Sequence, residues 1–592
     1  MKKYLFLFTF LLISQNIFAQ DDFQALDKII VYKIEPYELG EVRVITDEQI
    51  KNLPVQSVSE AIGYLGVDLQ SRGPFGVQTD FSIKGSTFQQ VLILINGMRI
   101  NDSQTAHHNS DLPVNLEDVE RIEVYPGNLN ASFGMDSFAG TINIVTKKPE
   151  ETKYTAQFSG GENATKMGSF SFGNRENNLS NQFSIERKES NGFQYDTDFK
   201  ILTVSSHHIY DFDLGNIKLD LGYNEKEFGA YDFYTPAKGY PSKEWTKTEF
   251  VGASAELNYD KFTFLPKIYW RRHYDKFMLD KTMPDWYVNH HKTDTFTQQC
   301  SLRFPVSFLG VLTLGEETIQ ERINSTNLGK YTREHHSFYI QNEKRLFDHF
   351  LFSLGSRYDH FDEFNDFFSP LFLIRYEFPS AQLHLSASRS IRRPSFTELY
   401  YSDPVTQGNP NLSVEEAINY ETGILCHFQD KHHLGLNFFA RDEDDLIDWA
   451  KTNPTDTKWK VRNIGSAQVL GLDIYGKINL IRPDLFFRYT YINREIKDKG
   501  GYLPKYGPIS LKHFLNIGFD FDFLSGKQRI NFFFKKRPTR RGWLLTDLRL
   551  STTIKEIEVF LDANNILNEE YEEIKGIPSP GRWVQAGLRV QW

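Results

Sequence analysis

The chain of 592 residues carries a formal net charge of −10 at pH 7, which argues against nucleic acid as its partner. Aromatic residues make up 15% of the sequence, although hydrophobic residues in total reach only 40%. Beyond residue 19 there is no run of 18 or more apolar residues, which argues against membrane-spanning helices and favours strands that are apolar on one side only.

The first 19 residues predict a secretory signal peptide, which is removed from a mature protein. Lys2 and Lys3 form a basic start, and Tyr4–Ser14 is an apolar stretch too short to span a bilayer as a helix. Ile17-Phe18-Ala19 supplies a cleavage site. A membrane anchor is the alternative interpretation. Residues 20–36 are then expected to form a short, partly extended segment.

Residues 37–148 predict a compact mixed α/β domain. Ser57 and Glu60 fit a capping box, and apolar residues follow at helical spacing. Val91–Ile95 (VLILI) is typical of a buried strand, and the Asn-Gly pair after it is a hairpin signal. Further strands are expected at Arg121–Tyr125 and Thr141–Thr146. A domain of this length can bury its own core.

Residues 149–592 change to strands of alternating polarity. In Gln382–Ser388, for example, Leu383 and Leu385 share one face while polar residues occupy the other. The terminal strand Val584–Trp592 alternates in the same way and ends on an aromatic residue, as strands of outer-membrane barrels do. At roughly 20 residues per strand and connection, the count comes to about 22 strands. A closed barrel of that width needs a plug.

The predicted fold is therefore an all-β transmembrane barrel of about 22 antiparallel strands, with an N-terminal mixed α/β plug domain inside its lumen. The predicted division is residues 1–19 as signal peptide, 20–36 as a periplasmic segment, 37–148 as plug and 149–592 as barrel. This fold predicts a location in the bacterial outer membrane, in contact with its lipid.

Four ordered segments resemble the TonB-dependent receptors of the bacterial outer membrane. Two lie in the plug, Ser57–Asp102 and Asp118–Lys148, and two in the barrel, Arg392–Gly423 and Asn564–Arg582. The plug segments are most similar to the cobalamin-receptor-like branch of the family. The resemblance implies active uptake of a scarce, bulky ligand such as cobalamin, another corrinoid or a ferric siderophore. It also implies a receptor for haem or a metal as an alternative cargo class.

In this family the periplasmic protein TonB, powered by ExbB and ExbD, pairs with a short N-terminal segment called the TonB box. The pairing is a strand addition, in which main-chain hydrogen bonds supply the affinity. The best candidate box is Leu26, Asp27, Lys28, Ile29, Ile30, Val31, Tyr32 and Lys33. Its two lysines depart from the family pattern and leave the register open. The rival, Glu41–Thr46, is expected to be the first plug strand instead.

Ligand contacts are expected from two outward-facing plug loops, Ser71–Thr79 and Asn101–Asn109. The side chains with suitable chemistry are Arg72, Phe75, Gln78, Gln104, His107 and His108. The alternative is that these residues only cap turns or face the barrel wall. A surface lipoprotein that covers the barrel is a further partner to consider.

No metal site, cofactor or enzyme is predicted. Five His-His pairs occur, but neighbours on a strand point to opposite faces and do not readily chelate one ion. Haem is less favoured because Ser395–Gly408 contains no histidine, where haem receptors of this family usually carry one. Hydrolase, zincin and P-loop motifs are missing from the sequence. The remaining alternatives are a passive pore, an adhesin or colicin-type binding surface, and an outer-membrane enzyme.

Overall fold

The computed structural model describes residues 42–592 except 237, 429–431, 481–482, 499, 506–509 and 524–525. The predicted signal peptide and the candidate TonB box at Leu26–Lys33 lie outside the described residues. Within the described part of the chain, every helix is too short or too polar to cross a membrane.

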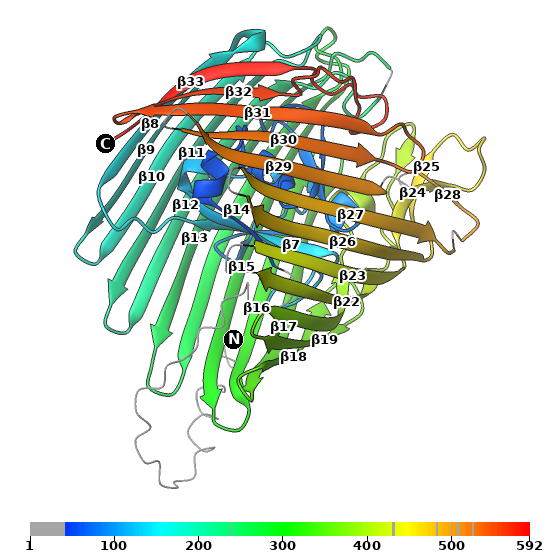
Figure 1. Ribbon diagram of the computed structural model, residues 1–592. Helices are drawn as coiled ribbons and strands as arrows, with labels where there is room; N and C mark the ends of the chain where they lie inside the picture. Colours follow the sequence, from blue (N-terminus) through cyan, green and yellow to red (C-terminus); the bar gives the residue numbers. More distant parts are fainter. Residues whose placement is uncertain are drawn as a thin grey trace. The chain divides into compact units, whose positions relative to one another are not determined.

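The described residues form a closed barrel of 22 antiparallel strands, in which each strand pairs with the next and the last pairs with the first (Figure 1). The predicted fold class is thereby confirmed. The barrel strands are β8 (Lys153–Gly161), β9 (Thr165–Glu176), β10 (Leu179–Ser190), β11 (Phe199–Phe212), β12 (Gly215–Gly229), β13 (Lys243–Asn258), β14 (Thr263–Met278), β15 (Val288–Val306), β16 (Gly310–Ser325), β17 (Gly329–Leu346), β18 (Phe350–Phe361), β19 (Phe367–Phe378), β20 (Ala381–Arg392), β22 (Glu415–Phe428), β23 (His432–Asp444), β26 (Ala467–Asn479), β27 (Asp484–Ile496), β29 (His513–Phe523), β30 (Gly526–Lys536), β31 (Trp543–Ile554), β32 (Ile557–Asn564) and β33 (Trp583–Gln591).

The barrel wall is apolar outside and polar inside. On β10, Phe183 and Ile185 are exposed, whereas Gln182, Ser184 and Glu186 are buried. The strands β20 and β33 show the same arrangement, with leucines outward and histidine, glutamine or arginine inward. An outward apolar face is stable only against hydrocarbon, so the barrel is built to sit in a bilayer.

Because the outer face is apolar, a charge introduced there should destabilise the barrel. Leu385 is the fifth of the 12 residues of β20 and is 49% exposed. We expect Leu385→Arg to destabilise the barrel in liposomes by about 2–4 kcal/mol, since the charge would face lipid. The denaturant midpoint of heat-modifiable migration on gels measures this. Leu385→Phe should stay near wild type, and equal midpoints for the two variants would contradict the assignment of this face to lipid.

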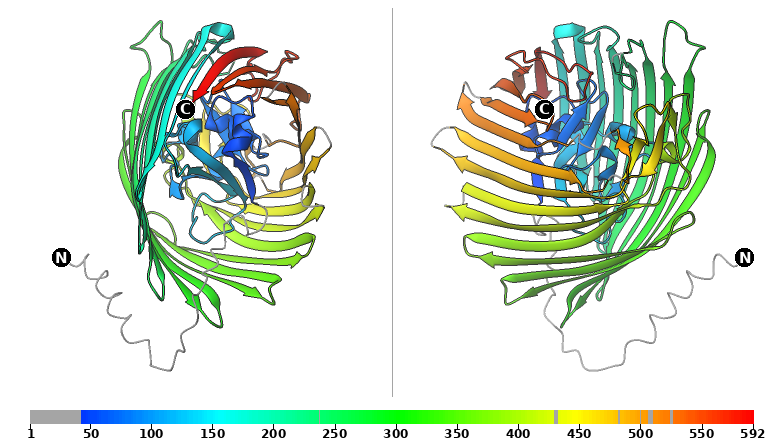
Figure 2. Two further views of the ribbon diagram at one scale, coloured as in Figure 1. Left: turned by 60° about the vertical axis from the view of Figure 1, so that its left-hand side comes forward. Right: turned by 90° about the vertical axis from the view of Figure 1, so that its right-hand side faces the viewer.

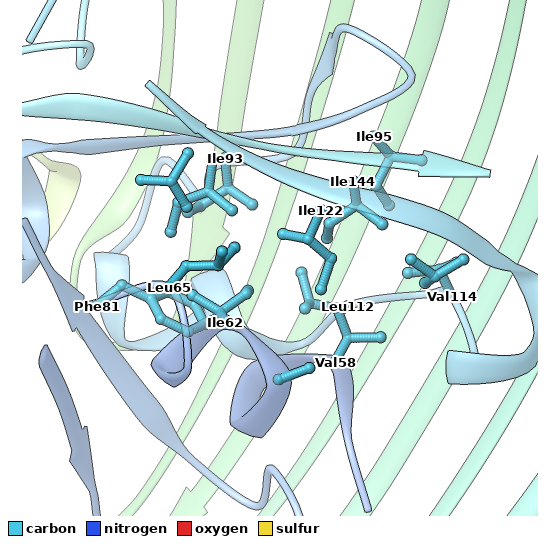
Figure 3. Packing of buried hydrophobic residues seen from close by; sticks show 14 of the residues in the cluster. Val58, Ile62, Leu65, Phe81, Ile93, Ile95, Leu112, Val114, Ile122 and Ile144 are labelled. Atoms are coloured by element: carbon cyan, nitrogen blue, oxygen red, sulfur yellow. The ribbon is translucent and has the colours of Figure 1, made fainter. Parts of the chain in front are cut away.

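The plug is a small α/β domain with its own core. Its main sheet has the order β1-β6-β7-β4-β5, and β4 runs parallel to β7. Figure 3 shows Ile93, Ile122 and Ile144 of this sheet beside Val58 and Ile62 of α3. The plug elements are β1 (Arg43–Thr46), α2 (Asp47–Lys51), α3 (Val58–Gly63), β2 (Asp68–Ser71), β3 (Thr79–Ser82), η2 (Phe88–Gln90), β4 (Val91–Ile95), β5 (Met98–Arg99), η3 (Ala106–Ser110), η4 (Leu116–Asp118), β6 (Val119–Pro126) and β7 (Gly140–Thr146).

The plug lies inside the barrel (Figure 2). It bonds to wall strands around the ring. Arg43 donates to Asp473 of β26 at 3.0 Å, and Gln56 donates to Asp562 of β32 at 2.9 Å. Plug residues also bond to wall residues of β10, β12, β14, β17, β22 and β33, namely Gln182, Lys226, Arg271, Gln341, Glu415 and Arg589. These partners are spread around the ring of strands, so the plug fills the lumen rather than lining one side.

The two ends of the barrel differ. At one end the strands are joined by short turns, such as residues 177–178 and 213–214. At the other end the connections are long, including 230–242, 393–414, 445–466 and 565–582. Outer-membrane barrels keep their short turns in the periplasm, so the end with long connections is the outer end. The connections there form α4 (Phe396–Tyr400) and a sheet of β21 (Thr406–Gln407), β25 (Trp459–Asn463), β24 (Ile447–Lys451) and β28 (Leu503–Pro504).

Candidate ligand-facing site

The first predicted ligand loop, between β2 and β3, bonds to the barrel wall at the outer end. Arg72 donates through Nε to the carbonyl of Phe233 at 3.4 Å, and Gln78 donates through Nε2 to the hydroxyl of Tyr234 at 2.6 Å. Arg72 also donates through Nη1 to Asp80 Oδ2 of β3 at 2.9 Å. Phe75 packs against Phe199 and Trp583, with ring centroids 5.6 and 5.2 Å away. This loop therefore anchors the plug to β11, β33 and the connection after β12.

The second predicted loop is folded by its own polar side chains. Asn109 Oδ1 accepts from the amide of Asp102 at 2.9 Å, and Asp102 Oδ1 accepts from the amide of Gln104 at 2.8 Å. Gln104 then donates through Nε2 to Asp275 Oδ2 of β14 at 3.0 Å. These bonds close the loop into a compact turn before η3.

His107 is the predicted ligand residue that keeps some exposure, 19% of its side chain. Its ring stacks on Phe88 with centroids 4.3 Å apart and planes 17° from parallel. Burial lowers the pKa of His107 below its usual value, although the Asp80 carboxylate 2.8 Å from Nδ1 opposes this. The ring is therefore neutral at pH 7 and forms, with Phe88, a small aromatic surface.

The other five predicted contacts are between 2% and 8% exposed. All five lie at the outer end, near one another, and all have partners on the plug or wall. Their contact with cargo remains a prediction. The partly exposed plug surface beside them contains Phe88 and Gln89, which are not among the residues predicted from the sequence. The Thr87–Gln90 capping box that begins η2 was the available signal for this turn.

A connection of the barrel covers the plug at this end. The amides of Phe396 and Thr397 in α4 donate to the carbonyls of Ser103 and Gln104 at 3.0 and 3.1 Å. Ser395 and Glu398 form the capping box that begins α4. A cavity of about 30 Å³, lined in part by Asp102, Ser103 and Ser395, is the space left beneath it.

Arg392 connects this cover to the plug and the wall. Its Nε donates to Glu415 Oε2 at 2.6 Å, and its Nη1 donates to Glu398 Oε2 at 2.9 Å and to Gln89 Oε1 at 2.7 Å. Glu415 also accepts from Gln90 at 2.8 Å. All these charged groups are buried, so one guanidinium holds α4, β22 and η2 together.

A buried charged cluster lies beside the second loop, where η3 meets β14. His273 Nε2 is 2.9 Å from Asp111 Oδ2, and His108 Nε2 is 3.4 Å from Asp275 Oδ2. Burial alone would lower the pKa of His108, but the Asp275 and Asp111 carboxylates raise it to about 10. Burial would raise the pKa of Asp111, but Lys226 and the two imidazoles hold it well below its usual range. The cluster thus favours positive charge at its centre.

A bilayer-spanning barrel, filled by a plug and covered by an outer connection, defines a gated outer-membrane receptor. The chain belongs to the TonB-dependent receptor family, since the model "TonB dependent receptor-like, beta-barrel" matches residues 98–566 and the model "TonB-dependent Receptor Plug Domain" matches residues 38–141. The predicted family is therefore confirmed, and with it the outer-membrane location.

Related proteins and structures agree with this family at low identity. The vitamin B12 transporter BtuB of Photobacterium profundum is 24% identical over 531 residues, which cover 83% of this chain and 82% of the relative. BtuB of Vibrio vulnificus is 22% identical over 594 residues, covering 94% and 93%. The siderophore receptor PirA of Acinetobacter baumannii matches with TM-score 0.76 and 18% identity, covering 94% of this chain and 99% of that one. The FrpB iron transporter of Neisseria meningitidis has TM-score 0.79 and 13% identity, with the same coverage. The structural matches show the shared fold.

Proposed function

We propose that this receptor takes up a scarce, bulky ligand across the outer membrane by TonB-driven active transport. The main support for active transport is the plug, which fills the lumen and bonds to wall strands around the whole ring. A bulky ligand passes only if the plug moves, and moving it breaks buried charge pairs such as Arg271–Asp102. Transport through this barrel therefore requires energy that the receptor itself does not supply. A passive pore would instead need an open lumen.

The energy is supplied by TonB, together with ExbB and ExbD, through the N-terminal segment. We assign the contact to Leu26–Lys33, which is rich in β-branched residues and suited to pairing as an added strand. The membership of the family supports this partner. The described chain enters the plug directly through β1 (Arg43–Thr46), in keeping with a box upstream of it.

The cargo is a corrinoid or a ferric siderophore. The curated relatives are cobalamin transporters, and the structural neighbours include siderophore receptors, so both classes have support. The Phe88–His107 surface suits either one, because stacked rings bind flat or aromatic faces such as those of a corrin ring or a catecholate. Haem or a metal chelate is the alternative within the family.

The test is a binding and uptake panel on the full-length receptor. Corrinoids, ferric catecholates, ferric hydroxamates and haem are titrated against detergent-purified protein, and uptake of each binder is followed in cells with and without ExbB. One cargo class should bind tightly, and its uptake should require ExbB. Uptake that persists equally without ExbB would overturn active transport, whereas tight binding of haem alone would overturn the cargo assignment.

The aromatic surface predicts which plug residues control affinity. We expect Phe88→Ala and His107→Ala each to weaken cargo binding about fivefold to tenfold, since a ring contact contributes about 1 kcal/mol beyond its buried area. Isothermal titration with the identified cargo measures this. Glu48→Ala on α2 is the control and should bind as wild type, because α2 lies toward the short-turn end of the barrel: Asp47 pairs with Lys147, and Lys148 pairs with Asp211 beside the turn 213–214. Unchanged affinity in both aromatic variants would exclude this surface as the contact.

A further inference from the structure

We propose that His108, Asp111 and His273 bind a divalent transition-metal ion that joins the plug to the barrel. His108 and Asp111 belong to the plug, at η3 and just after it, and His273 belongs to β14. One nitrogen or oxygen from each of the three lies within 4.8 Å of the others. All three side chains are buried, at most 3% exposed.

The separations fit the edges of a coordination polyhedron. Ligands at about 2.1 Å from a tetrahedral ion lie about 3.4 Å from one another. Asp111 Oδ2 is 2.9 Å from His273 Nε2 and 3.7 Å from His108 Nδ1, so the observed values bracket this edge. The two imidazole rings are 4.4 Å apart between centroids and tilted by 37°. The third edge, between one nitrogen of each ring, is within 4.8 Å, so binding of an ion would draw the two rings together.

Each ligand is also held from its far side, as metal ligands in proteins usually are. His273 Nδ1 faces Asp102 Oδ2 at 3.3 Å, and His108 Nε2 faces Asp275 Oδ2 at 3.4 Å. Such carboxylate–imidazole pairs orient the ring and make its other nitrogen a stronger donor. The second oxygen of Asp111 accepts from Lys226 Nζ at 2.8 Å. The three atoms that face one another are those left for the ion.

The charge around these atoms is suited to a dication. Asp102, Asp111 and Asp275 are three buried carboxylates, and Lys226 and Arg271 supply two fixed positive charges. Since an imidazole that binds a metal is neutral, one carboxylate is then left for the ion to balance. Two imidazoles and one carboxylate favour Zn²⁺ or a similar first-row ion over Mg²⁺ or Ca²⁺, which prefer oxygen ligands alone.

An ion at this position would cross-link the second loop to the wall. The loop carries Ser103 and Gln104, whose carbonyls accept hydrogen bonds from the amides of α4. The ion would therefore also stabilise the contact between the plug and the outer cover, which is the connection 393–414. The ion is therefore a structural cross-link between plug and wall, distinct from the cargo. Its removal would loosen residues 101–111 without unfolding the barrel.

The experiment uses the full-length receptor in detergent, stripped with a chelator and titrated with Co²⁺ and Zn²⁺. Visible absorption of Co²⁺ reports its coordination, and elemental analysis counts bound Zn²⁺. We expect one ion per chain and a tetrahedral or five-coordinate Co²⁺ spectrum. His273→Gln and His108→Gln should each lower affinity at least 100-fold. His207→Gln is the matched control, since His207 is a buried wall histidine 2.7 Å from Asp220, and it should bind as wild type.

Heat-modifiable migration shows whether each variant has folded. If one of the two glutamine variants does not fold, the other still tests the site. Hydrogen exchange of residues 101–111 gives a second measurement, which should slow with Zn²⁺ in wild type but not in His273→Gln. Absence of saturable binding, equal binding by His273→Gln, or equal loss in His207→Gln would overturn the site. The cluster would then be a hydrogen-bonded ion-pair network alone.

Discussion

Deletion of Asp27–Lys33 is expected to abolish cargo uptake while leaving cargo affinity within about twofold of wild type. The deleted segment lies upstream of the plug, so the outer-end surface around Phe88 and His107 keeps its bonds. Strand addition to TonB needs the main chain of this segment, and without it no force reaches the plug. Initial uptake rates of labelled cargo in cells and titration of the purified protein give the two measurements.

Two point substitutions sharpen this test. Ile30→Pro removes one main-chain donor and fixes φ, so it should reduce uptake at least tenfold. Lys28→Ala removes a charge but keeps every main-chain group, and it should retain most uptake because main-chain bonds carry the affinity. If the deletion variant takes up cargo at the wild-type rate, the barrel acts as a passive pore. If Lys28→Ala fails as badly as Ile30→Pro, side-chain recognition rather than strand addition governs the contact.

Much of the barrel was predictable because a strand's period of two depends only on local sequence. The alternation in Gln382–Ser388 falls within β20, with Leu383 and Leu385 outward and His384 inward. The same reasoning correctly separates His335, which is fully buried, from His336, which is 42% exposed. In the plug, the predicted strand Val91–Ile95 is β4, because an apolar run flanked by a turn signal has few other solutions.

The site was less predictable, because its contacts join residues far apart in the chain. His107 and His108 are neighbours in a 3-10 turn, so the argument that adjacent strand residues diverge does not apply to them. His108 meets His273, which lies on β14 and is brought there by the register of the barrel and the rotation of the plug. Neither quantity can be obtained from local periodicity. Phe75 was predicted as a candidate ligand contact, with the barrel wall as the alternative, and its ring packs on the wall residues Phe199 and Trp583.

For the outer cover, the sequence predicts a helix but not the surface on which that helix docks. Ser395 and Glu398 have capping-box spacing, which predicts the start of a short helix. That spacing says nothing of where the helix docks. Docking depends on bonds from Arg392, Phe396 and Thr397 to Gln89, Ser103 and Gln104 of the plug, which lie about 300 residues earlier in the chain. The local sequence therefore predicted the helix, whereas its partner is determined by how the plug lies in the barrel.

Arg392→Ala is expected to release the outer cover, since it would leave the buried carboxylates of Glu398 and Glu415 without their cation. Breaking a buried ion pair by removing one partner costs about 3–5 kcal/mol. Arg389, three residues earlier on β20, makes a similar pair with Glu416 at 2.7 Å, but that pair is 37% and 34% exposed. Arg389→Ala should therefore cost no more than about 1 kcal/mol. The two variants remove the same side chain from the same strand and differ in burial.

Hydrogen exchange of the amides of Phe396 and Thr397, which donate to the plug, measures the release. A loss of about 3–5 kcal/mol would speed their exchange by more than about 100-fold, against less than about tenfold for Arg389→Ala. Arg392→Met combined with Glu398→Gln and Glu415→Gln should recover part of the protection, because it removes the uncompensated charges. Equal exchange in Arg392→Ala and Arg389→Ala would mean that main-chain bonds from α4 to Ser103 and Gln104 hold the cover by themselves. Protection retained in Arg392→Ala but lost in the triple variant would place the holding force in the carboxylates, through their bonds to Ser395 and Gln90.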